Sequence, residues 1–150
     1  NVVQNATPGG QQFDGLSIFD GGAEVSYAGF AFGGHVSTGT FNGNMNMSAK
    51  GQKTTTVWNL GASYSTGPYT VGFHWINWTR PGIQTAASPA SERGTGVAVG
   101  GTYAWAPGVR TFVEFVWGEK TEKGTDLRIG NGISDNINGT GLVIGQAFRW

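Results

Sequence analysis

The chain has 150 residues, a formal net charge of zero, no cysteine, 27 glycines and only 12% charged residues. This length allows one domain or a piece of one, and the sequence has no basic run that would suit a nucleic-acid partner. A disordered chain would carry more charge, and the lack of cysteine excludes disulfide scaffolds and Cys-based metal sites.

Residues 1–20 are predicted to be a loop, which the stretch "NVVQNATPGGQQFDG" suits. From residue 21 onward, large apolar residues alternate with small or polar ones at a period of two, which is typical of strands. Three segments share one plan, in which a strand reaches a tyrosine, a tight turn follows and a second strand returns: "GAEVSYAGFAFGGHVS", "VWNLGASYSTGPYTVGFHWINWT" and "GTGVAVGGTYAWAPGVRTFVEFVWGE". The ending "GLVIGQAFRW" adds a seventh strand.

Two kinds of connection alternate along the chain. The turns "AGF", "STGPY" and "WAPG" contain the glycine and proline that short hairpin connections need. The connections near residues 38–54, 80–93 and 119–138 are long, polar and rich in Gly, Asn, Ser and Lys. The pattern therefore predicts antiparallel strands with short turns at one end and long loops at the other.

Alternation also sorts the side chains of these strands onto two faces. One face carries most of the large aliphatic and aromatic residues. The other carries glycine, small polar residues, both histidines and every charge that we place inside a strand. On this second face the candidates for a functional surface are Glu24, His35, Asn59, His74, Arg110, Glu114 and Arg149.

Strands with two such faces occur in soluble β-sandwiches and in outer-membrane barrels. Three features favour the barrel: aromatic residues gather toward both strand ends, short and long connections are segregated, and the aromatic last strand needs a sheet neighbour. The predicted aromatic girdle residues are Tyr27, Trp58, Tyr64, Tyr69, Trp75, Tyr103, Trp105, Trp117, Phe148 and Trp150, with Trp78 beside Trp75 toward the long loops.

The segments "VWNLGASYSTGPYTVGFHW", "VGGTYAWAPGVRTFVEFVWGE" and "GLVIGQAFRW" resemble the C-terminal hairpins and last strand of Gram-negative general porins, especially those of alphaproteobacteria. A terminal Trp replaces the Phe that is usual in that family. The resemblance implies an all-β protein, an antiparallel transmembrane β-barrel of about 16 strands, of which this chain supplies the C-terminal seven or so. It also implies short periplasmic turns, long extracellular loops and a place in the bacterial outer membrane.

The same resemblance implies the function and the partners. We expect a water-filled channel for passive diffusion of small hydrophilic solutes and ions, with the seven candidates on the second face lining the pore. We expect no enzyme activity, no cofactor and no metal. Residues 1–20 would be an extracellular loop and residues 21–150 barrel strands. The partners would be outer-membrane lipid and lipopolysaccharide, two further protomers of a homotrimer, the barrel-assembly machinery through the C-terminal strand, and the N-terminal half of the same porin.

Two alternatives remain open at this point. A small eight-stranded outer-membrane barrel with a structural or adhesive role fits the length, and "GLSIF" is the only candidate for its eighth strand. A soluble β-sandwich that binds carbohydrate through exposed tryptophans would instead bury the apolar face between two sheets.

Overall fold

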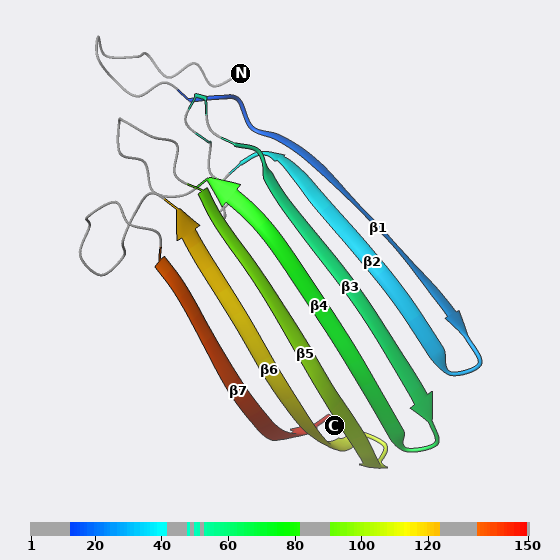
Figure 1. Cartoon of the computed structure of the whole chain (residues 1–150). Coiled ribbons are helices and arrows are strands. Elements are labelled where there is room, and N and C mark those ends of the chain that lie inside the picture. Colours follow the sequence, from blue (N-terminus) through cyan, green and yellow to red (C-terminus); the bar gives the residue numbers. More distant parts are fainter. Residues whose placement is uncertain are drawn as a thin grey trace.

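The computed structural model describes residues 13–41, 48, 50–51, 53–81, 91–123 and 135–149. These residues form a single antiparallel sheet in which each strand pairs with the next one along the chain (Figure 1). No helix in this part of the chain is long and apolar enough to cross a membrane. The strands are β1 (Ser17–Tyr27), β2 (Phe30–Thr40), β3 (Thr55–Thr66), β4 (Tyr69–Pro81), β5 (Ser91–Ala106), β6 (Val109–Lys123) and β7 (Asp135–Phe148).

Two-residue turns close the three hairpins at one end of the sheet, as the sequence predicts. Ala28 and Gly29 both have positive φ, the backbone of a type I′ turn, whose twist matches that of the flanking strands. Gly108 has a φ of 82° and follows Pro107, the arrangement of a type II turn. A register shift between Ala104 and Ala106 accompanies this third turn.

The strands are longer than the alternation predicts. β1 begins at Ser17, not at residue 21, because Ser17 pairs with Thr40 and the ladder continues without a break to the turn. The segment "SIF" is therefore the start of β1 and not a separate eighth strand. At the other long connections, β4 continues to Pro81, β5 begins at Ser91 and β6 continues to Lys123.

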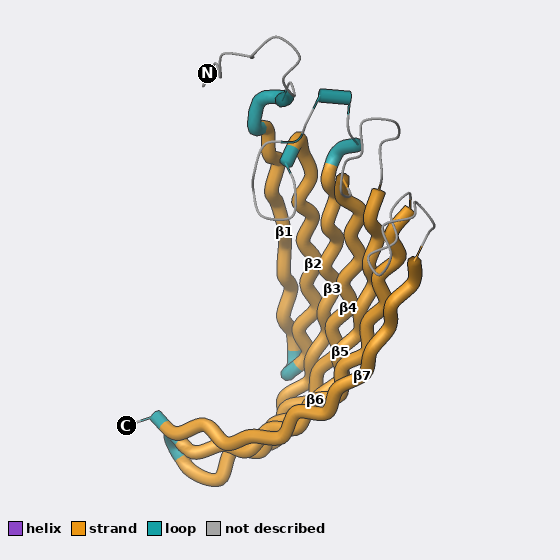
Figure 2. The backbone as a smooth tube through the Cα atoms, turned by 90° about the vertical axis from the view of Figure 1, so that its left-hand side faces the viewer, coloured by secondary structure: helices purple, strands orange, loops and turns teal. Residues whose placement is uncertain are grey.

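The sheet is curved and stands alone as one layer (Figure 2). Phe41, only 4% exposed, is the one large apolar side chain among the described residues that is buried. A sandwich would place half of these strands in a second sheet over the apolar face. The sandwich prediction is therefore wrong for the described part of the chain, since all seven strands pair side by side.

Candidate functional site

One face of the sheet is apolar and uncovered. Cross-strand pairs such as Val25 with Phe32 and Phe115 with Leu142 confirm that the large apolar residues share this face, which we call the apolar face. Leu142 and Ile144 are 66% and 69% exposed, which is far from the burial of a soluble core. Further exposed members of the apolar face are Leu60, Val71, Phe73, Val99 and Val113.

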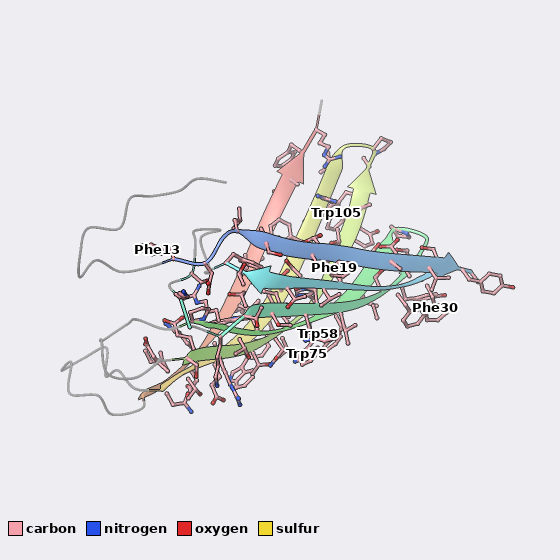
Figure 3. The ribbon with its side chains drawn as sticks, turned by 90° about the horizontal axis from the view of Figure 1, so that it is seen from above. Phe13, Phe19, Phe30, Trp58, Trp75 and Trp105 are labelled. Atoms are coloured by element: carbon pink, nitrogen blue, oxygen red, sulfur yellow. The ribbon has the colours of Figure 1, made fainter. Side chains whose placement is uncertain are left out.

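Aromatic residues on the apolar face interact near the turns. The Tyr103 ring lies 4.9 Å from that of Tyr69 and 4.6 Å from that of Trp105, centroid to centroid. The indole N–H of Trp105 donates a hydrogen bond to Thr111 Oγ1 at 2.9 Å. Figure 3 shows Phe30 at the turn end, with Trp58 and Trp75 farther toward the long connections. Tyr27, Tyr64 and Phe148 join the turn-end group, and Trp117 pairs with Val97 beside Trp75.

The opposite face is hollowed, and we call it the concave face. Its hollow has a volume of about 600 Å³, far more than the roughly 15 Å³ that a cavity needs on the same measure to hold one water molecule. Five of the predicted candidates line it together: Glu24, His35, Asn59, His74 and Glu114. The hollow is open enough for water and hydrated ions to reach these polar side chains.

The two predicted arginines lie outside the hollow. Arg110 pairs with Ala147 on the concave face and is close to the β5–β6 turn. Arg149 follows the last residue of β7, and its backbone N–H donates to the Gly108 carbonyl at 2.7 Å. No ion pair joins Arg110 to Glu114 within the described part of the chain, so the two side chains act as separate charges. Trp150 lies outside the described residues.

Glycine stands opposite the large side chains of the concave face. His35 faces Gly22, and a Cβ added to Gly22 would lie 3.2 Å from the His35 side chain. Phe112 faces Gly145, where an added Cβ would lie 2.4 Å from the ring. The same pairing recurs for Glu24 with Gly33, His74 with Gly61, Trp78 with Gly94 and Glu114 with Gly100. Glycine thus leaves room for these side chains to lie along the wall.

The family comparison agrees with this two-faced sheet. A family model described as Gram-negative porin matches residues 2–123. The chain belongs to the Gram-negative porin family. No curated protein matches the chain. The match spans the first six strands and includes two of the three segments that carry the sequence resemblance, whereas the last segment, "GLVIGQAFRW", lies beyond the matched residues.

Family membership places the protein in the bacterial outer membrane and in a class of channels, not of enzymes. The described residues are consistent with part of a porin barrel, with β1 and β7 as the two open edges of the sheet. In an outer-membrane barrel of this kind, the apolar face of the strands meets lipid and the polar face lines the lumen. The alphaproteobacterial affiliation stays a prediction.

Strand β1 contributes a polar group, the Asp20 carboxylate, that the sequence prediction missed. His35 Nε2 and Asp20 Oδ1 lie 2.7 Å apart on the concave face. The prediction of a loop for residues 1–20 leaves Asp20 outside the strands. The signal that could have found it is its spacing, since Asp20, Gly22 and Glu24 occupy alternate positions and so share a face.

A second group of charges, which we call the mouth cluster, lies at the long-connection end of the concave face. It consists of Arg80, Glu92, Lys120 and Glu122. Arg80 Nε donates to Glu92 Oε2 at 2.6 Å, and Lys120 Nζ lies 3.3 Å from Glu92 Oε1 and 3.8 Å from Glu122 Oε2. The side chains of Glu92 and Glu122 are 7% and 1% exposed, so these cations offset the cost of burying them.

Trp78 lies on the concave face beside the mouth cluster, and not in the aromatic girdle of the apolar face. Trp78 pairs with Gly94, whose added Cβ would lie 2.3 Å from the indole, and the Arg80 guanidinium lies 4.7 Å above the ring centre. Placing it with Trp75 was wrong, because residues three apart in a strand point to opposite faces.

Two charges that the sequence places in the long connections lie instead in strands, on the side of the apolar residues. Arg93 pairs with Thr79, and Glu119 pairs with Asn138, on the side of the apolar residues. Both lie toward the long connections, beyond Val97 and Trp117. Asn136 Nδ2 donates to Glu119 Oε1 at 2.8 Å, which satisfies this carboxylate where the strands extend past the apolar band.

The concave face offers little support for a catalytic or metal-binding site. Ser63 and His74 both line the hollow, but no hydrogen bond joins them within the described part of the chain. Within that same part, no three His, Asp or Glu side chains come together in a way that could hold a metal ion. The geometry therefore offers a polar, open wall and not a nucleophile with its base.

Proposed function

We propose that the concave face is one wall of a water-filled pore through which small hydrophilic solutes and ions diffuse passively. The observation that carries this proposal is the hollow, where histidine, asparagine and glutamate side chains stand among glycines. Such a wall would bind solutes only weakly, so that solutes could enter the pore at one end and leave it at the other. The exposed apolar face gives the same sheet its contact with lipid.

Several partners belong to the same proposal. Outer-membrane lipid and lipopolysaccharide would cover the apolar face, and the aromatic groups near both strand ends would lie at the two membrane interfaces. The edges at β1 and β7 support pairing with further strands of a barrel of about 16 strands. Assembly as a homotrimer, recognition of the C-terminal strand by the barrel-assembly machinery and an extracellular position for residues 1–20 also stay proposals.

Cysteine labelling tests the assignment of the two faces, because the chain has no cysteine of its own. We would introduce His74→Cys on the concave face and, as a matched control on β4, Val71→Cys on the apolar face. The porin, purified from outer membranes, would be reconstituted in planar bilayers and treated with a charged, membrane-impermeant thiol reagent.

The expected result is a fall in single-channel conductance for His74→Cys and none for Val71→Cys. A fall for Val71→Cys with no change for His74→Cys would place the lumen on the wrong side and overturn the face assignment. A purified, folded porin that gives no conductance steps at all would overturn the channel proposal itself.

A further inference from the structure

We propose that Glu114 and Glu24 bias this part of the pore wall toward cations. The inference rests on the proposed channel function and names the side chains that set its ion preference. Both carboxylates line the hollow, one from β6 and one from β1, so passing ions meet them from two sides of the concave face.

Neither carboxylate has a cationic partner among the residues that the structure describes. Glu114 is exposed, and no hydrogen bond or ion pair involves its side chain within the described part of the chain. Within that same part of the chain, the Glu24 side chain has one hydrogen bond, in which the Ser26 hydroxyl donates to Glu24 Oε1 at 3.4 Å. Their charges therefore face the solution, in contrast to those of Glu92 and Glu122.

No ion pair in the described part of the chain joins a basic side chain of the concave face to Glu24 or Glu114. Arg80 and Lys120 are held by the carboxylates of the mouth cluster at 2.6–3.8 Å, so that cluster carries two positive and two negative charges. Arg110 lies four positions from Glu114 along β6, about 13 Å away at the rise of a strand. That separation exceeds the screening length of about 10 Å in 0.1 M salt.

The expected size of the effect depends on salt. For an ion passing about 5 Å from one carboxylate in water, Coulomb attraction changes the local concentration about two-fold at 0.1 M salt. At 1 M salt the screening length falls to about 3 Å and the change falls to about 1.3-fold. Selectivity should therefore weaken as the salt concentration rises.

The test compares two isosteric substitutions on the same strand. Glu114→Gln removes a charge from the hollow, and Glu119→Gln removes one from the opposite side of β6, where glutamine can still accept the Asn136 hydrogen bond. Glu24→Gln provides a second test from the other side of the hollow. Each purified porin would be placed in a KCl gradient across a planar bilayer, and the reversal potential would give the cation-to-anion permeability ratio.

We expect Glu114→Gln and Glu24→Gln each to lower this ratio about four-fold in 0.1 M salt, because each carboxylate raises the cation concentration and lowers the anion concentration about two-fold, and about 1.7-fold in 1 M salt. Glu119→Gln should leave it unchanged. If both hollow variants conduct with the ratio of the native porin, or if Glu119→Gln shifts it equally, the inference is wrong although the channel proposal stands. If the native porin does not conduct, the channel proposal fails and the ratio cannot be measured.

Discussion

The mouth cluster makes a prediction about stability that can be worked from distances. Arg80→Ala removes a charge-assisted hydrogen bond of 2.6 Å to the buried Glu92 carboxylate, a contact that is typically worth about 1.5–3 kcal/mol. It also removes the cation–π contact with Trp78, which adds about 0.5–1 kcal/mol. Because Arg80 is one-third exposed, solvent screening reduces both contributions. We expect Arg80→Ala to lower the free energy of unfolding by about 2 kcal/mol.

The assay is urea unfolding of the purified porin in detergent, followed by tryptophan fluorescence. Arg93→Ala is the matched control, because Arg93 is exposed on the other side of β5 and makes no ion pair among the described residues. In a Glu92→Gln background, Arg80→Ala should lower the free energy of unfolding by less than half as much, because the buried Glu92 charge is no longer present. The mouth cluster does not stabilise the sheet if Arg80→Ala lowers the free energy of unfolding no more than Arg93→Ala does. The same conclusion follows if Arg80→Ala lowers it equally with Glu92 and with Gln at position 92.

Two further predictions concern β7. Gly145→Ala should lower the free energy of unfolding by about 1–3 kcal/mol, because the new Cβ overlaps the Phe112 ring. Gly139→Ala on the same strand is the control: its Cβ meets open space, so it should change the free energy of unfolding little in the same urea assay. Gln146→Leu should leave single-channel conductance unchanged, since Gln146 pairs with Thr111 on the apolar face, and a clear change in conductance would place this residue in the lumen.

The number and order of the strands could be predicted from the sequence because the signals are local. A period of two, a tyrosine before each turn and Gly or Pro within it are all contained in segments of fewer than about 30 residues. The parity of Glu24, His35, His74 and Glu114 followed from the same signal, and the structure brings these side chains into one hollow.

The ends of the strands could not be predicted in the same way. Near Arg80 and Glu92 the residues no longer alternate between apolar and polar, because both faces are polar beyond the apolar band. What extends the ladder there is pairing across strands, such as Arg80 with Glu92 and Glu92 with Glu122. These partners are 12 and 30 positions apart in the chain, and no periodicity within one strand reveals them.

The high glycine content acquires a structural reason once the register is known. On the inner side of a curved sheet the space above each strand narrows, so two large side chains in neighbouring strands would compete for it. Pairing His35, His74 and Glu114 each with a glycine lets the larger side chain lie across its neighbour and leaves the hollow open. On the pore wall that we propose, these glycines would keep the polar groups on the surface and the path between them free for water.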